Sequence, residues 1–316
     1  MTSPFGSEKV IKEHISEADL KTYFVGFDLN DKDQKVYRWK NLIDVLQNVI
    51  PEFAFGHHEG TSTDNNKMVE KVKEAARSIY KIKEFKEAKE IYEKDGEIAD
   101  DDEEKKYLKR GEFGELILHL LLRDFHNTIP LLSKIYFKDT YGSTVHGFDA
   151  VHIQLKTKTL WLGESKLYTD GKKGIAALIE DIKNHFKQNY LQKEFAIVSK
   201  KIKPYNYQEK NYWLDLMDKN TKLEDLLKSV TIPLVCTYTS DNFTKYDDEA
   251  LPEFIDDYEK EVRGLKKYFD EHNNHPLKTH LNIILLLFPV KGKNELVKRM
   301  HKKLYNLQSG EDDECE

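Results

Sequence analysis

Apolar residues recur along most of this chain at the spacings of helices and strands, which predicts a folded protein that mixes both. In the first hundred residues the pattern predicts a strand at residues 23–29, followed by a helix at residues 39–49 that Pro51 ends. A polar loop is expected at residues 57–66. A long helix rich in lysine and glutamate is expected at residues 67–94.

From about residue 105 short apolar runs alternate with helical patterns. Strands are predicted at residues 134–138, 147–154, 160–168, 195–199, 232–238 and 280–288. Helices are predicted at residues 112–124, 174–190, 223–229, 251–272 and 295–307. This alternation predicts an α/β architecture with three parts: an N-terminal α+β region (1–105) suited to binding a partner, an α/β domain (106–310) and an acidic tail (311–316).

Charge is distributed unevenly along the 316 residues. The net charge is −6, but the acidic runs at residues 93–104 and 311–316 carry net charges of −7 and −5, so the remainder is at +6. Residues 151–210 alone hold twelve lysines against six acids. The whole-chain charge therefore hides a basic middle, while the acidic runs serve either solubility or contact with a basic partner.

Several classes of protein are disfavoured by the sequence. The longest apolar run, at residues 281–290, is too short to cross a hydrocarbon core of about 30 Å. The N-terminus lacks the pattern of a secretory signal, and the two cysteines, Cys236 and Cys315, build neither a disulfide framework nor a zinc site. No phosphate-binding loop of the Walker type is present. A cytoplasmic protein is expected.

The residues with the clearest chemistry lie on two neighbouring predicted strands. Asp149 is on the first, and Glu164 and Lys166 share one face of the second, because side chains alternate along a strand. If a two-residue turn at Lys156-Thr157 joins the strands, opposed positions sum to 313, which puts Asp149 across from Glu164 at about 5 Å. Carboxylates this close repel unless a cation lies between them, and Mg²⁺ (or Mn²⁺) suits such ligands. A lysine beside the cation would position water and offset charge at a phosphate.

This pattern has an ordinary interpretation too. Acid-x-Lys recurs by chance in so charged a chain, for example at Asp33-Gln34-Lys35, and a Glu-Lys ion pair on a sheet needs no catalytic role. The apolar neighbours of Glu164 favour the catalytic interpretation, because a buried acid and lysine require a reason. Glu112 and Glu115, one turn apart at the start of the next helix upstream, offer a further ligand, with Glu115 preferred for its apolar neighbours; complementing the helix dipole is the alternative.

Other polar residues are weaker candidates. Lys172 and Lys173 precede a predicted helix start and are expected to contact a nucleic-acid phosphate, unless they form an ordinary lysine-rich loop. Stacking on bases is a weaker interpretation than packing for the following aromatic residues: Tyr205, Tyr207, Tyr212 and Trp213. A metal cluster of His272, His275 and His280 is disfavoured.

These motifs carry a family resemblance. Arg110-Gly-Glu-Phe-Gly-Glu115, Gly147-Phe-Asp149 and Gly163-Glu-Ser-Lys166 resemble the PD-(D/E)xK nuclease superfamily, and residues 107–190 more closely resemble HamA, the nuclease family of the Hachiman anti-phage defence system. The resemblance implies a restriction-endonuclease-like core, a central mixed sheet flanked by helices. It also implies metal ligands at Asp149, Glu164 and Glu115, and a catalytic lysine at Lys166. The chain departs from the superfamily pattern in having Phe148 where proline often precedes the aspartate.

The resemblance also implies a DNA substrate and a superfamily 2 helicase partner (HamB-like). A net charge of −6 with one basic zone predicts weak binding to duplex DNA by the chain alone, which fits delivery of the strand by a helicase. The main alternative is a catalytically silent subunit that binds DNA or restrains the helicase. An RNA-processing nuclease would use the same metal chemistry.

Overall fold

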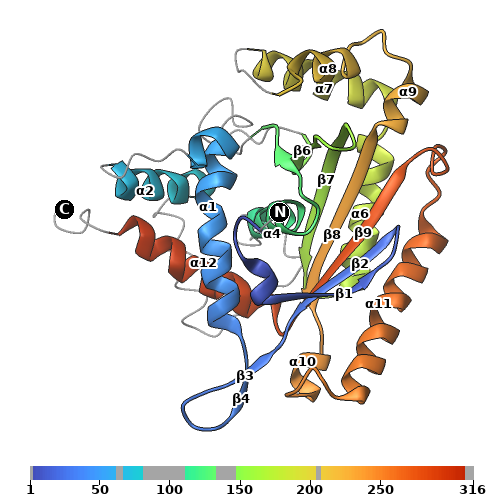
Figure 1. The fold of residues 1–316 in the computed structure, drawn as a ribbon. Coiled ribbons are helices and arrows are strands. Elements are labelled where there is room, and N and C mark those ends of the chain that lie inside the picture. Colours follow the sequence, from blue (N-terminus) through green and yellow to red (C-terminus); the bar gives the residue numbers. More distant parts are fainter. Residues whose placement is uncertain (1–2, 62–66, 81–110, 133–146, 204–207, 310–316) are drawn as a thin grey trace, which may run out of the picture.

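A seven-stranded mixed sheet forms the centre of the protein in this computed structural model, which describes residues 3–61, 67–80, 111–132, 147–203 and 208–309 (Figure 1). Its strands, in spatial order, are β1 (Ile11–Ser16), β2 (Leu20–Val25), β9 (Asn282–Val290), β8 (Val230–Thr239), β7 (Thr159–Tyr168), β6 (Ala150–Gln154) and β5 (Ile129–Pro130). The four strands from β2 to β7 run parallel, and the pairs at either side are antiparallel. The first strands of the chain therefore extend the same sheet as the last.

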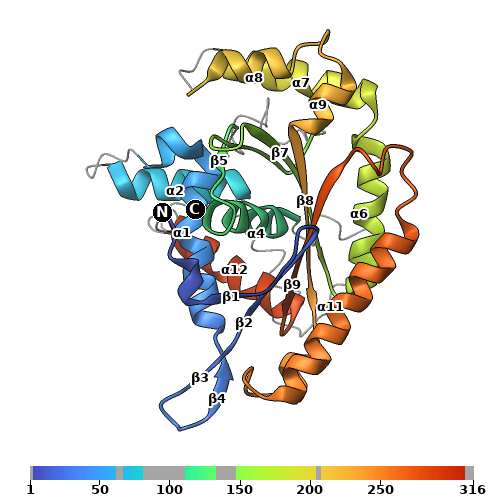
Figure 2. The ribbon, with the colours of Figure 1, turned by 45° about the vertical axis from the view of Figure 1, so that its right-hand side comes forward.

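Helices cover both faces of this sheet. On one face lie α6 (Gly171–His185) and α11 (Pro252–His272), and on the other α4 (Gly111–Asp124), with α1 (Trp39–Thr61), α2 (Met68–Ile79) and α12 (Lys293–Gln308) packed around it (Figure 2). Shorter helices are η1 (Ser7–Lys9), α7 (Gln188–Ile202), α8 (Lys210–Leu216), α9 (Leu223–Lys228) and α10 (Asn242–Lys245). A small hairpin of β3 (Phe27–Leu29) and β4 (Lys35–Tyr37) projects from the sheet. The predicted α/β architecture, a mixed sheet flanked by helices, is confirmed.

Helix α11 shows how the sequence pattern produces this packing. Its buried residues recur every three or four positions, so one stripe of the helix faces the core while the charged positions face water. The stripe consists of Phe254, Tyr258, Val262, Leu265 and Phe269. Strand β8, by contrast, is buried at every position but its last, as expected of a central parallel strand covered on both faces.

Three predictions about elements were wrong. Residues 195–199 belong to helix α7, not to a strand; the buried positions Leu191, Phe195, Val198 and Ile202 have helical spacing, which a four-residue apolar run conceals. Helix α1 continues through Pro51 and part of the predicted polar loop, and its backbone departs from helical geometry at Gly56, with φ 84°. Strand β1 was missed, and the predicted strand at 23–29 is divided between β2 and β3.

Some sequence predictions fall on residues outside those described. These are the strand at 134–138, residues 81–94 of the helix predicted at 67–94, the acidic runs, Arg110, Tyr205 and Tyr207. The prediction of one continuous helix at 67–94 was also wrong, because α2 ends at Ile79 and Tyr80 is extended. The boundary near residue 105 lies there too, so the division into domains stays a prediction. No helix in the described part of the chain combines the length and the apolar character that crossing a bilayer requires.

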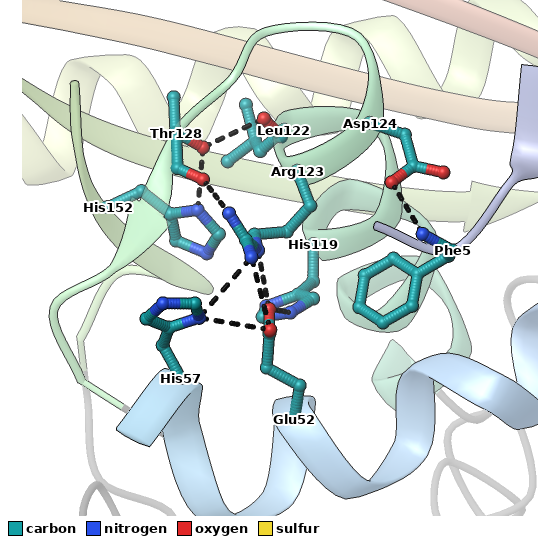
Figure 3. A network of polar contacts seen from close by, with 9 residues as sticks. All are labelled: Phe5, Glu52, His57, His119, Leu122, Arg123, Asp124, Thr128 and His152. Carbon is teal, nitrogen blue, oxygen red and sulfur yellow. Dashed lines mark hydrogen bonds and ion pairs between the residues drawn. The ribbon is translucent and has the colours of Figure 1, made fainter. Parts of the chain in front are cut away.

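A buried ion-pair network fastens helix α4 to the N-terminal helix α1 (Figure 3). The Glu52 carboxylate accepts hydrogen bonds from Arg123 Nε at 2.5 Å and His119 Nε2 at 3.0 Å. The same guanidinium donates a hydrogen bond to the backbone carbonyl of Thr128. The side-chain hydroxyl of Thr128 lies 2.8 Å from His152 Nδ1. This network fixes the helix whose first turns carry Glu112 and Glu115.

Candidate functional site

Strand β7 presents alternate residues to helices on opposite faces of the sheet. A Cβ on Gly114 of α4 would lie 3.3 Å from the Ser165 Oγ and 3.5 Å from the Leu167 Cβ, so these two side chains face α4. Glu164 and Lys166 face α6 instead, where each has a partner. The shared face predicted for Glu164 and Lys166 is therefore present.

Asp149 lies just before strand β6, where the β6–β7 ladder ends. The register pairs Ala150 with Gly163 and Gln154 with Thr159, which keeps the predicted sum of 313. The turn itself comprises the four residues 155–158, not two, and Lys158 takes a left-handed conformation with φ 53°. The Asp149 Oδ2 accepts hydrogen bonds from the Ser165 N–H and hydroxyl, both at 2.8 Å. Asp149 is thus adjacent to the Glu164–Lys166 segment, bonded to the residue between them.

Glu164 is almost fully covered, with 2% of its surface exposed. Its Oε1 lies 2.5 Å from Nδ1 of His185, in the last turn of α6. The imidazole stacks on Tyr190 at 4.6 Å between ring centroids, with 13° between the planes, and meets Phe148 edge-on at 6.2 Å. Phe148, at the position where the superfamily that the sequence resembles often has proline, therefore packs against the partner of Glu164.

Lys166 is paired with Asp181, one turn before His185 on α6, at 2.5 Å between Nζ and Oδ2. Burial alone would lower the pKa of the lysine, but the charges of Asp181, Asp149 and Glu164 outweigh it and raise that pKa. Lys166 is consequently a charged ammonium, and its pair with Asp181 leaves two of its three N–H donors for other acceptors.

The electrostatics around Glu164 are those of a crowded set of acids. Burial raises the pKa of its carboxyl well above the usual value, and the charges of Asp149, Asp181 and Glu115 raise it further, against a smaller lowering by Lys166. Among the described residues, the carboxyl groups of Glu164, Asp149, Asp181 and Glu115 thus share one neighbourhood with the Lys166 ammonium. Glu115, the helix residue preferred as a ligand, contributes to this field.

Two further observations bear on whether a cation fits here. Among the described residues the buried Tyr190 hydroxyl has no hydrogen-bond partner, and its pKa is raised by burial and by the nearby charges of Glu194, Glu164, Asp181 and Asp149. However, within the described ranges no three acidic, histidine or cysteine side chains converge closely enough to hold a metal ion as they stand. The donor set suits a hard cation, but Asp149 and Glu164 are bonded to Ser165 and His185 in this arrangement.

The lysines predicted to contact phosphate are exposed at the start of α6. The Asp170 side chain caps this helix by accepting from the backbone N–H groups of Lys172, at 2.7 Å, and Lys173, at 3.1 Å. Two of the N–H groups available to an anion are therefore already used, and a phosphate contact here would depend on the side chains.

The weaker candidates belong mostly to the core. Trp213 is fully buried and Tyr212 packs beside it, which agrees with packing rather than base stacking. His275 is buried and its Nδ1 accepts the N–H of Leu277. No metal cluster forms from it and the other histidines in the part of the chain that is described.

Sequence reasoning missed the three partners of the motif on its α6 side: Asp181, His185 and Tyr190. A signal was present, since Asp181 and His185 are four positions apart on the helix predicted at 174–190, and residues at that spacing share a face. The sequence did not indicate which face of this helix packs on β7.

Comparison with known families decides the relationship. The family profile of HamA matches residues 4–304, nearly the whole chain. The chain belongs to the HamA family. HamA proteins are subunits of the Hachiman anti-phage defence system, so the match supports a role in that system. Neither the curated proteins nor the solved structures include a significant match to the chain.

Proposed function

We propose that this HamA-family protein is the effector nuclease of its defence system, a Mg²⁺-dependent deoxyribonuclease of the PD-(D/E)xK type with a restriction-endonuclease-like core. The observation that carries the proposal is the crowding of three carboxylates, those of Asp149, Asp181 and Glu115, around the buried Glu164, with Lys166 on the same strand face. Such a concentration of negative charge is unfavourable in the absence of a cation, and cation-dependent sites are built this way.

Asp149, Glu164 and Glu115 would hold Mg²⁺ (or Mn²⁺). The cation supplies Lewis-acid polarisation of the scissile phosphate and a bound water of lowered pKa. Glu164 could offer its Oε2 while Oε1 keeps His185, whereas Asp149 would have to turn its carboxylate from Ser165. The two remaining N–H donors of Lys166 would hold the attacking water and offset charge on the phosphate oxygens.

A superfamily 2 helicase of the HamB kind is the proposed partner, and DNA the substrate. The exposed Lys172 and Lys173 beside the α6 start would contact the DNA backbone. Because one moderate basic zone neutralises few phosphates, we expect DNA binding by the isolated chain to be weak and strongly dependent on salt.

One observation favours a second candidate function, a catalytically silent subunit that binds DNA or restrains the helicase. Asp149 and Glu164 both have hydrogen-bond partners in the protein, and no ready metal cluster exists among the described residues. A silent subunit would keep those bonds permanently, whereas a nuclease would exchange the bond at Asp149 for a metal ligand.

The experiment that separates the two is plasmid cleavage by the chain, alone and with its helicase partner, in Mg²⁺ or in EDTA. We expect Mg²⁺-dependent cleavage that Glu164→Ala and Lys166→Ala each abolish, while circular dichroism and partner binding are unchanged. The control variant Glu180→Ala removes an exposed acid of α6 and should cleave as the unchanged protein does. Cleavage that survives both motif substitutions would refute the nuclease.

A further inference from the structure

Helix α6 contacts both motif residues of strand β7 that face it. His185 is bonded to Glu164, and Asp181, one turn earlier, is paired with Lys166. The two partners are four positions apart on the helix and their targets two positions apart on the strand, and these spacings correspond in general to roughly 5–6 Å and about 7 Å. This match of repeat lengths lets one rigid helix face hold both side chains.

The ring of His185 is itself held from two sides. Tyr190, from α7, stacks on it, and Phe148, next to Asp149, meets its edge. Phe148 also contacts Tyr190 at 6.0 Å and Phe186 at 5.3 Å between ring centroids. The imidazole orientation is therefore determined by packing, which is the condition for holding a carboxylate in one direction.

We infer that His185 and Asp181 are positioning residues for the site, His185 fixing the Glu164 carboxylate for cation binding and Asp181 fixing the Lys166 ammonium. The inference rests on the proposed function. A carboxylate with one oxygen bonded to an imidazole N–H presents its other oxygen in a defined direction, and groups behind metal ligands act in this way. The contact of Glu164 Oε1 with His185 Nδ1, at 2.5 Å, holds this buried side chain on its α6 side.

The test measures Mn²⁺ binding by the full-length chain, from the loss of the electron paramagnetic resonance signal of the free ion. His185→Ala should weaken binding by about 10- to 100-fold. His185→Asn places an amide donor near the position of Nδ1 and should restore most of the affinity. The matched control is Asn184→Ala, which changes an exposed neighbour on the same helix and should bind as the unchanged protein does.

A second variant separates a loss of Mn²⁺ binding from a loss of folding. His185→Gln keeps the side-chain volume but moves the donor by one bond, so it should melt close to the unchanged protein yet bind Mn²⁺ nearly as weakly as His185→Ala. For Asp181, the substitution Asp181→Asn should lower the cleavage rate at saturating metal by about 10- to 100-fold through misplacement of Lys166, with KM changed far less.

The outcomes distinguish the inference from the proposed function. An unchanged protein that binds Mn²⁺, with loss in Glu164→Ala but not in His185→Ala, would overturn the role of His185 and leave the nuclease standing. Tighter binding by His185→Ala would also overturn it, because His185 would then compete with the cation. If the chain binds no Mn²⁺ and cleaves no DNA, alone or with its partner, both the inference and the proposed nuclease function are refuted.

Discussion

Two buried carboxylates of this protein, Glu52 and Glu164, differ sharply in their attraction for a proton. Burial acts to raise the pKa of both. At Glu52, hydrogen bonds from His119, His57 and Arg123 outweigh burial and lower the pKa far below its usual range, whereas the carboxylates around Glu164 raise its pKa still further. The difference separates a structural ion pair from a candidate functional acid.

Replacing Glu164 should therefore stabilise the protein. When the pKa of a carboxyl is raised in the folded state, the folded protein loses stability as the pH rises above the carboxyl's pKa in the unfolded chain, about 4.3. The reason is that the unfolded chain ionises first. Glu164→Gln removes this cost, and we expect the unfolding free energy at pH 7 to increase. Chemical denaturation without divalent ions measures it, and a loss of stability would contradict the electrostatic description.

His126 gives the stability of the fold a pH dependence in the acidic range. Burial lowers the pKa of its imidazole to about 3. Because the unfolded histidine takes up a proton below about pH 6.5, stability falls as the pH is lowered, by about 2 kcal/mol between pH 7 and pH 5. His126→Gln keeps a polar group near Tyr23 and should reduce this difference by that amount. Denaturant titrations at both pH values check it, with the exposed His272→Gln as control.

At the scale of elements, the Glu52–Arg123 pair joins α1 to α4. Both side chains are buried, so removing one leaves the other charged and unpaired, which costs about 3–5 kcal/mol. We expect Arg123→Ala to lower the unfolding free energy by that amount. The exposed pair of Lys40 and Asp44 on α1 is the matched control, where Lys40→Ala should cost far less because water screens the pair. Equal effects at the two sites would argue against a structural role for the network.

The seating of α6 on the sheet depends on a glycine. A Cβ on Gly174 would lie only 2.6 Å from the Cys236 Sγ of β8, so Gly174→Ala should push the helix outward and destabilise by about 1–3 kcal/mol. Gly264 on α11 has open space around it, and Gly264→Ala should instead stabilise by about 0.5–1 kcal/mol. If α6 positions the motif, Gly174→Ala should also weaken Mn²⁺ binding, which Gly264→Ala should not.

Most helices and strands could be predicted from the sequence, and the predictions that were wrong have physical causes. Long amphipathic segments such as α11 were placed correctly because their periodicity is sustained over several turns. The register was predicted from an assumed two-residue turn, and the observed four-residue turn keeps the same sum of 313, with Ala150 beside Gly163. The helix at 195–199 was mistaken for a strand because four apolar residues fit both periods. The partners Asp181 and His185 escaped notice because tertiary packing selects the helix face.

At the scale of the whole molecule, the N-terminal strands belong to the central sheet. Strand β2 pairs in parallel with β9, near the opposite end of the chain, with Leu20 beside Leu285. A fragment of residues 106–316 would expose the edge of β9 and leave Arg123 without Glu52. We expect this fragment to lack a cooperative thermal transition in calorimetry. A cooperative fragment would support the division predicted from the sequence.

The pairing of β2 with β9 also bears on how the protein is made. The partner of Leu20 is translated about 265 residues later, a delay of roughly 15–50 s at 5–20 residues per second. A nascent chain therefore holds all the motif residues long before its sheet can close. If the protein acts as proposed, its activity would have to await the synthesis of β9, because the sheet that supports the motif is incomplete until then.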